Sequence, residues 1–540
     1  MRRFLLPAVL TLLAAVGGVG VAQPSAPSAP GTPGAPSLPT DTQQQVSADR
    51  PIPVPATPSC KVALMTHDFQ NSYGSPYNGT YTPPAACPGP WAKVVLTLTS
   101  TVGGTQFDRD VYVAIGHAVV LDGTTSEPCC TGANASTWTV QRDVTDITAL
   151  LRTPQPVQVE LDNVNDSTYT GVYHTLVSLT FYRTDAHAPA GPHADRVLPV
   201  SSTGKGGPML SISKNGQQVG APVVFPRNLD RLHAQVFADS HGPCEEFWWG
   251  DPGQCAGTPY REIAVYLDGK LAGAAPAYPG IYTGAGGPGL WEPIPAPRAW
   301  NLRPYDLDLT PFVGLLTDGR AHTVQLGVLD MTLAGGDFWA IAANLQIWTA
   351  HSGARTRGHL LSATAPAHPT DTITDPTTQG VPYTDTTSHT LTFKGDRVVD
   401  GRHVTTTVSE QMGESARQAV LVDDGSWTWT QSTTTEAGGH KTVDTQTAAY
   451  KLTTDVFTTY QIEDSGTTAS TVDNVRTAWT SYDETMRTAD ATGIAFNGAE
   501  QEQYGYADNT GACYDHQLAS QAGEVTVDQV LSSGCPSAPA

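Results

Sequence analysis

Positive charge is scarce in this chain of 540 residues, where 29 Lys and Arg stand against 51 Asp and Glu and the formal net charge is −22. Because so acidic a chain repels phosphate groups, its composition argues against nucleic acid and anionic membranes as partners. Charged residues of both signs make up only 15%, whereas Gly (52) and Pro (42) are frequent. Together with abundant Thr, this composition favours an all-β, turn-rich protein over a helical one.

Long apolar runs are missing after the first residues of the chain. The run Phe4–Val16 follows the basic stretch Met1–Arg3 and is too short for a comfortable membrane span, and Gly20–Ala22 supplies small residues at a cleavage site. We therefore expect a signal peptide over 1–22 and a secreted protein, with an uncleaved anchor as the alternative. No later segment is long and apolar enough to cross a bilayer.

Proline recurs at every third residue from Pro24 to Pro39, among Ser, Ala, Gly and Thr. This pattern is typical of an extended or disordered spacer. We therefore expect a Pro-rich linker over 23–52 and ordered structure after it.

An internal repeat organises the chain beyond the linker. The matching stretches, in chain order, are Arg109–Ile115 with Arg261–Leu267, Asp143–Thr145 with Asp308–Thr310, and Val157–Val159 with Val324–Leu326. In the first pair, apolar residues alternate with others at the period of a strand that buries one face. The repeat predicts two tandem β-sandwiches, over 53–190 and 191–354.

The composition changes at about Ser362, where Thr becomes dominant and polar residues outnumber apolar ones. Alternation typical of strands persists, so we expect a third, Thr-rich β domain over 355–540. The stretch Ser362–Tyr383 has the composition of a linker and favours a separable accessory domain. The alternative is a domain that packs over the second sandwich and covers its apolar face.

Several catalytic motifs are absent from the sequence. It contains no HExxH, no CxxC pair and no Gly-x-Ser-x-Gly, which removes the usual support for a zinc protease or a serine hydrolase. We expect no metal and no other cofactor. Carboxylates beside aromatic residues stand out instead, in Phe107-Asp108-Arg109, Ser126-Glu127-Pro128 and Glu245-Glu246-Phe247-Trp248-Trp249.

Each of these acids also has an ordinary structural explanation. Asp108 could form a surface ion pair with Arg109, and Glu127 could satisfy a turn before its proline. The repeat argues for a function of Asp108, because Arg109 aligns with Arg261 whereas Asp108 aligns with Tyr260. A β-sandwich of this kind therefore does not itself require an acid at that position.

The paired acids Glu245 and Glu246 could belong to a solvated loop, with Trp248 in the core. Followed by Phe-Trp-Trp, they also suit a sugar site, because aromatic faces pack against pyranose rings and carboxylates accept hydrogen bonds from hydroxyls. Of the two, we regard Glu246 as the better candidate.

The eight cysteines are expected to be paired in an oxidising compartment. Proximity in sequence predicts the pairs Cys60–Cys87, Cys244–Cys255 and Cys513–Cys535, which leaves Cys129 and Cys130 as a vicinal disulfide or as free thiols. A bridge between Cys244 and Cys255 would close the loop that carries Glu245 and Glu246.

An ordered set of motifs resembles a known family over about Cys60–Trp348. The set comprises Phe107-Asp108-Arg109, Ser126-Glu127-Pro128, Trp138 with Asp143-Val144-Thr145, Glu246-Phe247-Trp248, Arg261-Glu262, Leu290-Trp291 with Pro293-Ile294, and Asp308-Leu309-Thr310-Pro311. It is similar to the peptide-N4-(N-acetyl-β-glucosaminyl)asparagine amidase A family. The resemblance implies two jelly-roll-like domains with the active site between them. It also implies hydrolysis of the bond between an asparagine side chain and its N-linked glycan.

That reaction assigns roles to the candidate residues, with N-glycosylated peptides or glycoproteins as substrates. Asp108 would activate a water molecule, and Arg109 or Arg261 would stabilise the oxyanion. Glu246 and Glu127 would hold the first GlcNAc and relay protons. The remaining substrate-binding candidates are Glu245, Trp248, Trp249 and Trp291.

Two other functions fit the same sequence. One is a non-catalytic carbohydrate-binding or adhesion protein built on the same sandwiches, and the other is a glycosidase that uses two carboxylates. The products distinguish all three, because an amidase converts Asn to Asp, a glycosidase leaves GlcNAc on Asn, and a binding protein changes nothing.

Overall fold

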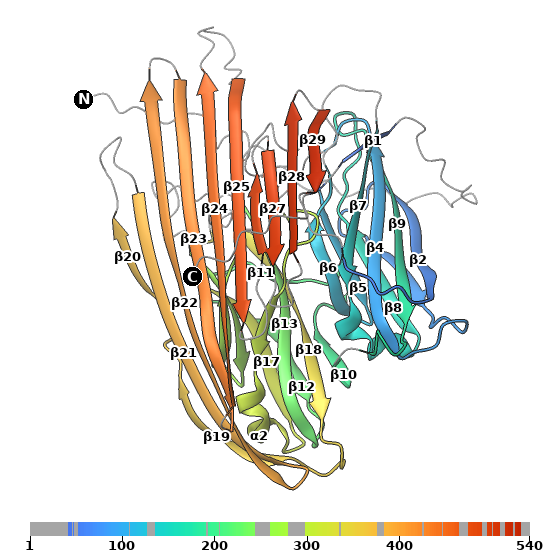
Figure 1. Cartoon of the computed structure of the whole chain (residues 1–540), viewed down its shortest axis with the longest axis vertical. Helices are drawn as coiled ribbons and strands as arrows, with labels where there is room; N and C mark the ends of the chain where they lie inside the picture. Colours follow the sequence, from blue (N-terminus) through green and yellow to red (C-terminus); the bar gives the residue numbers. More distant parts are fainter. Residues whose placement is uncertain are drawn as a thin grey trace.

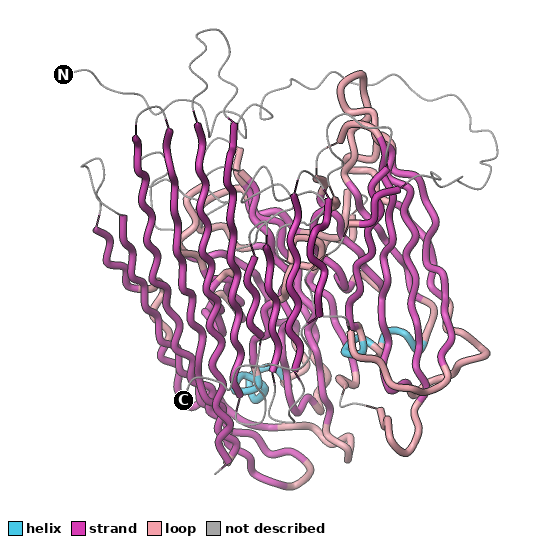
Figure 2. The backbone as a smooth tube through the Cα atoms, turned by 45° about the horizontal axis from the view of Figure 1, so that its top comes forward, coloured by secondary structure: helices cyan, strands magenta, loops and turns pink. Residues whose placement is uncertain are grey.

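The computed structural model describes most of the chain. The described residues are 42–45, 47, 52–106, 108–126, 135–190, 193–204, 206–242, 260–278, 298–333, 336–374, 383–423, 426–444, 446–463, 474–488, 494–498, 501–507, 513–521 and 524–530. The predicted signal peptide lies outside these residues. The described part consists almost entirely of antiparallel β-sheets with a few helical turns, which confirms the predicted all-β class (Figures 1 and 2).

The first unit consists of two sheets with a buried core between them. Its sheets have the strand orders β1-β7-β4-β9-β2 and β3-β8-β5-β6. Trp138, Tyr173 and Phe181 belong to the core, to which both sheets contribute. The strands are β1 (Thr42–Gln44), β2 (Ser59–Phe69), β3 (Tyr77–Tyr81), β4 (Trp91–Gly103), β5 (Asp110–Ile115), β6 (Ala118–Thr124), β7 (Ala135–Asp143), β8 (Gln155–Leu161) and β9 (Val172–Arg183), with helical turns η2 (Thr145–Ile147) and η3 (Leu150–Arg152).

The second unit repeats this arrangement, with the sheets β10-β18-β13-β16 and β12-β17-β14-β15. The short strand β11 (Leu210–Ile212) also pairs with β18. The other elements are β10 (Arg196–Val200), β12 (Val219–Val224), β13 (Leu229–His241), β14 (Glu262–Leu267), β15 (Lys270–Pro276), β16 (Tyr305–Asp308), η5 (Thr310–Phe312), α2 (Val313–Leu316), β17 (Ala321–Leu329) and β18 (Phe338–Thr349).

The repeat in the sequence corresponds to a repeat in the structure. Strand β5 lies between β8 and β6, just as β14 lies between β17 and β15. The register of β5 against β6 shifts between Val113 and Ala114, and the register of β14 against β15 shifts one repeat later, between Val265 and Tyr266. The two Asp-x-Thr motifs also have the same geometry, because in each the threonine amide donates to the aspartate Oδ1, at 3.0 and 2.9 Å.

The C-terminal region forms a large antiparallel sheet of long strands, in the order β19-β21-β22-β23-β24-β25, with β20 paired to β21, and a smaller sheet β26-β27-β28-β29. The strands are β19 (Arg357–Thr364), β20 (Thr370–Thr374), β21 (Tyr383–Val399), β22 (Arg402–Asp423), β23 (Ser426–Val443), β24 (Gln446–Glu463), β25 (Asn474–Thr488), β26 (Ile494–Gly498), β27 (Gln501–Ala507), β28 (Cys513–Gln521) and β29 (Glu524–Val530). Figure 1 shows the second unit between the first unit, in blue, and the large sheet, in orange.

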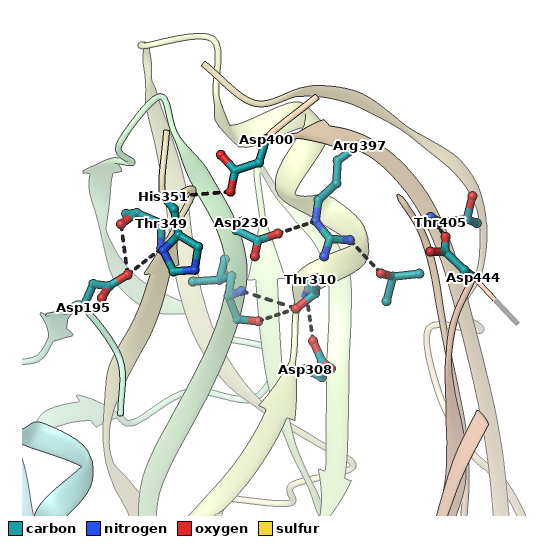
Figure 3. Close-up of polar contacts among 12 residues, drawn as sticks. Asp195, Asp230, Asp308, Thr310, Thr349, His351, Arg397, Asp400, Thr405 and Asp444 are labelled. Atoms are coloured by element: carbon teal, nitrogen blue, oxygen red, sulfur yellow. Dashed lines mark hydrogen bonds and ion pairs between the residues drawn. The ribbon is translucent and has the colours of Figure 1, made fainter. Parts of the chain in front are cut away.

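The large C-terminal sheet packs directly on the second unit. Leu391, Phe393 and Met412 belong to the same buried core as the second sandwich, and the Phe393 ring lies 5.1 Å from that of Phe312. An ion pair of 2.9 Å joins Arg397 Nε to Asp230 Oδ1 at the edge of this interface (Figure 3). These are the contacts of a domain that covers the apolar face of the second sandwich, and not those of a separable accessory domain.

One predicted disulfide lies within the described side chains. Cys60 and Cys87 are bonded, as predicted from their proximity. The other cysteines belong to side chains that the structure does not describe, so their pairing stays a prediction. Among the described helices, none has the length and apolar character that a membrane crossing requires.

Candidate active site

Asp108 and Arg109 immediately precede β5, at the side of the first sandwich that faces the second. The Arg109 amide donates to Thr125 Oγ1, and the Thr125 amide donates back to the Arg109 carbonyl, both at 2.8 Å. The Arg109 guanidinium donates to Gln106 Oε1 through Nε and Nη2, at 3.1 and 2.6 Å. Its Cζ also lies 5.5 Å from the centre of the Tyr169 ring. These contacts fix the backbone and the direction of this arginine.

Six of the predicted site residues lie outside the described part of the chain, namely Glu127, Glu245, Glu246, Trp248, Trp249 and Trp291. Their described neighbours show where two of these segments start. Ser126, which precedes Glu127, is fully buried, and its carbonyl accepts a 3.5 Å hydrogen bond from the Tyr173 hydroxyl. The segment with Glu245 and Glu246 follows Gly242, directly after the end of β13 at His241.

A cluster of acids lies beside Asp108, where the two sandwiches meet. Tyr112 on β5 is directly opposite Asp122 on β6 and Glu160 on β8, so these side chains share one face of the sheet. Strand β13 of the second sandwich contributes further groups to this face. We call the following residues the acidic cluster: Asp110, Asp122, Glu160, Asp162, Asp239 and His241.

Hydrogen bonds connect the two sandwiches within the acidic cluster. The Tyr112 hydroxyl donates to Asp239 Oδ2 at 2.8 Å, and the same oxygen lies 3.1 Å from His241 Nε2. On the other side of the imidazole, Nδ1 lies 3.8 Å from Asp110 Oδ2. The His241 ring stacks on Phe338, with the ring centres 4.2 Å apart and an angle of 10° between the planes. His241 is therefore held between two carboxylates.

Burial changes the proton affinity of the cluster. It raises the pKa of Asp110 to about 7. The charge of His241 lowers this pKa in part, and the charge of Asp239 raises it further. Burial also raises the pKa of Glu160 to about 8 and that of Asp122 well above its usual range. Burial by itself lowers the pKa of His241, but the carboxylates of Asp110 and Asp239 have the larger combined effect and raise it to about 10. The cluster therefore contains carboxyl groups that hold a proton near neutral pH.

Three members of the cluster have the donor atoms of a cation site. Asp110, Asp239 and His241 each offer one atom, and these atoms lie within 4.8 Å of one another. Carboxylate and imidazole donors of this kind suit a divalent ion. The ring of His241, however, directs Nδ1 toward one carboxylate and Nε2 toward the other, which is the arrangement that an imidazolium requires. We therefore assign no metal to this cluster.

Arg261, the second arginine predicted in the site, lies at the interface with the C-terminal sheet. It is 2% exposed, and its Nη1 donates to the Tyr260 carbonyl at 2.9 Å. Its charge also acts on the buried Glu414 of β22, where it opposes the rise in the pKa that burial causes. The described contacts of Arg261 thus belong to this interface, whereas those of Arg109 lie beside the acidic cluster.

The repeat places equivalent acids at both interfaces of the second unit. Glu262 occupies the position of Asp110, and its Oε2 lies 2.7 Å from Nδ1 of His389 on β21. The other ring nitrogen of His389 lies 3.0 Å from the Pro366 carbonyl, and Glu262 Oε1 accepts a 2.6 Å bond from the Tyr260 hydroxyl. Each acid therefore contacts a histidine from the unit that follows it in the chain.

None of the members of the acidic cluster was predicted from the sequence as a site residue. One signal was available, because alternation in Arg109–Ile115 puts Asp110 and Tyr112 on the face opposite the core residues Val111 and Val113. The approach of Asp239 and His241 had no such signal, since it depends on how two separate sheets dock.

We expect the free energy of unfolding to decrease as the pH rises from about 4.5 to about 8, with Glu160 as one cause. Burial raises the pKa of Glu160 from 4.5 to about 8, so in this interval the folded chain binds more protons than the unfolded chain. Stability therefore falls with rising pH. The variant Glu160→Gln cannot ionise and should lose the part of this decrease that Glu160 causes, an amount on the order of a few kcal/mol. Thermal unfolding at about pH 5 and about pH 8 measures the difference.

Glu436→Gln is the matched control for this experiment, because Glu436 is exposed and pairs with Lys451 on the C-terminal sheet. It should leave the pH dependence unchanged. An unaltered pH dependence in Glu160→Gln would contradict the assignment of a buried, protonated carboxyl at this position.

Comparison with known proteins agrees with these observations. Residues 39–366 match the family described as peptide N-acetyl-beta-D-glucosaminyl asparaginase amidase A. A curated relative, peptide-N4-(N-acetyl-beta-glucosaminyl)asparagine amidase A of Prunus dulcis, is 32% identical over 338 residues. The match spans 58% of this chain and 58% of the length of that relative.

Solved structures give weaker matches. PNGF-II in its P21 crystal form matches with a TM-score of 0.40 and 15% identity over 54% of this chain and 66% of that chain. A peptide-N(4)-(N-acetyl-β-D-glucosaminyl)asparagine amidase crystal structure at 2.2 Å matches with a TM-score of 0.36 and 15% identity, over 54% and 96%. The family match covers both sandwiches and the acidic cluster between them, so the chain belongs to the peptide N-acetyl-β-D-glucosaminyl asparaginase amidase A family.

Proposed function

We propose that this chain is a secreted amidase that hydrolyses the bond between an asparagine side chain and its N-linked glycan. The observation that carries this proposal is the family match over residues 39–366, which includes both sandwiches and Asp108. The substrates are N-glycosylated peptides or glycoproteins, as the name of the Prunus dulcis relative suggests.

In this reaction, Asp108 acts as the general base. Its carboxylate takes a proton from a water molecule, whose oxygen attacks the side-chain carbonyl carbon of the substrate asparagine. Asp108 lies close enough to Asp110 for its charge to raise the pKa of that neighbour. This effect is smaller than those of burial, His241, Asp239 and Asp162 on the same pKa. The carbon–nitrogen bond then breaks, the glycosylamine leaves with a proton, and the asparagine becomes an aspartate.

The oxyanion that forms during the attack needs a positive charge that is already in place. A guanidinium supplies it, because it stays protonated throughout the reaction. Of the two candidates, Arg109 is better placed than Arg261, since its side chain is anchored by Gln106 beside the acidic cluster. We assign the oxyanion to Arg109.

The glycan contacts rest on the family resemblance, because these residues lie outside the described part of the chain. Glu246 and Glu127 hold the first GlcNAc and relay protons through bound water. Glu245, Trp248, Trp249 and Trp291 complete the sugar site. The cluster supplies nearby carboxyl groups that hold protons near neutral pH, which the leaving amine requires.

One incubation with a glycopeptide tests the function. In water enriched in oxygen-18, the wild-type protein should release the intact glycan and leave a peptide whose new aspartate carries one heavy oxygen, as mass spectrometry would show. The same peptide without its glycan is the control and should stay unchanged. GlcNAc left on asparagine would identify a glycosidase, and an unchanged glycopeptide would identify a non-catalytic binding protein.

Secretion has its own test. The protein exported by cells should begin at Gln23, as N-terminal sequencing of the mature chain would show. Retention of the first residues in a membrane fraction would instead support the uncleaved anchor.

A further inference from the structure

A groove of about 730 Å³ adjoins the acidic cluster on the first sandwich. Asn78 of β3 and Ala114 of β5 lie on either side of Gln158 of β8 and line the groove with it. Thr203 and Gly204 of the second unit also line it. The volume lies within the range of ~300–1,000 Å³ that is typical of ligand pockets.

The groove begins where the acidic cluster ends. Gln158 and Glu160 are two residues apart on β8, so their side chains share a face and lie about 6–7 Å apart along the strand. The Gly74 amide, at the rim of the groove, donates to Asp162 Oδ1 of the cluster at 2.8 Å. Gly207 of the second unit, whose φ is +113°, approaches the same acid, since a Cβ at this position would lie 1.9 Å from Glu160 Oε2. A ligand could therefore extend from the cluster into the groove.

The described lining of the groove combines apolar residues, among them Pro76, Pro156 and Val157, with hydrogen-bonding side chains and the imidazole of His117. Gln158 Nε2 donates to Asn78 Oδ1 at 3.3 Å, which aligns the two amide groups along one wall. Ser75 and Thr203 contribute hydroxyls. Among the described lining residues there is no Lys, Arg, Asp or Glu. Paired amides and hydroxyls of this kind match the neighbouring hydroxyl groups of a sugar ring.

An exposed aromatic residue directly precedes the part of the chain that lines the groove. Tyr73 directly precedes Gly74 and is 72% exposed, although most large aromatic side chains of this unit are in the core. Partial burial raises the pKa of Tyr73, and the carboxylates of Asp162, Asp110 and Glu160 raise it further. An accessible aromatic face beside amide groups is suited to the apolar face of a pyranose.

We propose that this groove binds the sugars of the glycan that lie beyond the GlcNAc attached to asparagine, with Tyr73 stacking on one ring and Asn78 and Gln158 bonding to hydroxyls. The inference rests on the amidase function proposed above and adds a glycan subsite to it. The amide pair of Asn78 and Gln158 favours hydroxyl-rich sugars over a peptide segment, which would be held mainly by backbone pairing and apolar pockets.

Two glycopeptides with the same peptide test the subsite. One carries only two GlcNAc residues and the other carries a large high-mannose glycan. Tyr73→Ala should lower kcat/KM about tenfold for the large glycan, mainly through KM, and less than about twofold for the short one. Gln158→Ala should act in the same direction. Tyr73→Phe, which keeps the ring, is the matched control and should stay near the wild type, with thermal unfolding unchanged in all three variants.

Two outcomes would overturn the proposal. An equal loss for both glycopeptides would mean that Tyr73 acts at the scissile bond and not in a subsite for outer sugars. A loss that follows the length of the peptide, and not the size of the glycan, would assign the groove to the peptide.

A binding measurement separates this inference from the proposed function. Calorimetric titration of the full chain with the free high-mannose glycan should detect binding that Tyr73→Ala weakens and Tyr73→Phe retains. If the wild type binds this glycan through Tyr73 but hydrolyses no amide, the function fails and the subsite stands. If the wild type hydrolyses glycopeptides but the free glycan does not bind, the subsite fails and the function stands.

Discussion

Replacing Asp108 with asparagine is expected to lower kcat for glycopeptide hydrolysis by about 10²–10⁴-fold, with little change in KM or thermal unfolding. The two side chains have the same shape, but an amide cannot take a proton from the attacking water. The segment around Asp108 is held by the backbone bonds between Arg109 and Thr125, which the substitution leaves in place. Steady-state kinetics with a glycopeptide, beside a melting curve, measures the effect.

Asp68→Asn is a suitable control for this experiment. Asp68 lies on β2 of the same sandwich, is exposed, and pairs with His174 at 2.8 Å. Its substitution should leave both kinetic constants unchanged. Near wild-type turnover in Asp108→Asn would remove Asp108 from the mechanism, whatever the control shows.

Ending the chain at Ala354 should cause the largest loss of stability. The shortened chain would expose the apolar face that Leu391, Phe393 and Met412 cover, and Glu262 would lose His389. Truncating one buried phenylalanine alone typically costs about 3–5 kcal/mol, and a whole domain is stable by only about 5–15 kcal/mol. We therefore expect aggregation or a broad, low-temperature unfolding transition, as calorimetry and light scattering would show.

Point variants separate this interface from a general effect of shortening the chain. Phe393→Ala should destabilise the full chain by about 3–5 kcal/mol. Ile373→Ala, at a 43% exposed position on β20 of the same sheet, should have little effect. A shortened chain that melts and hydrolyses like the wild type would restore the separable accessory domain that the sequence favoured.

The repeat shows how far sequence alone could go. The alternation around Val111 and Val265 predicted strands, which the structure has as β5 and β14, although both faces of these strands are buried. The matching offsets predicted two β-sandwich units in tandem. The pair Cys60–Cys87 followed from proximity. Each of these predictions concerns residues within one unit, where the local pattern and the short connections restrict the possible pairings.

Contacts between units could not be predicted in the same way. Asp239 is 127 residues from Tyr112, and Glu262 is 127 residues from His389, so neither hydrogen bond leaves a local pattern. Alternation shows that a side chain points away from the core of its own unit, but not which surface of another unit it contacts. The linker-like composition near Ser362 favoured a separate domain, whereas the apolar residues Leu391 and Phe393 are what hold the sheet to the second sandwich.

The two acid–histidine contacts have a consequence for synthesis of the chain, because Asp110 and Glu262 each contact a histidine made later. Domains generally fold in order as they leave the ribosome. The first sandwich therefore emerges with its acidic face in water and acquires His241 only when β13 is complete. The second sandwich in turn waits for His389, and for the apolar residues up to Ala437 on β23, before its outer sheet is covered. Until then, the nascent protein exposes an apolar surface that a chaperone could cover.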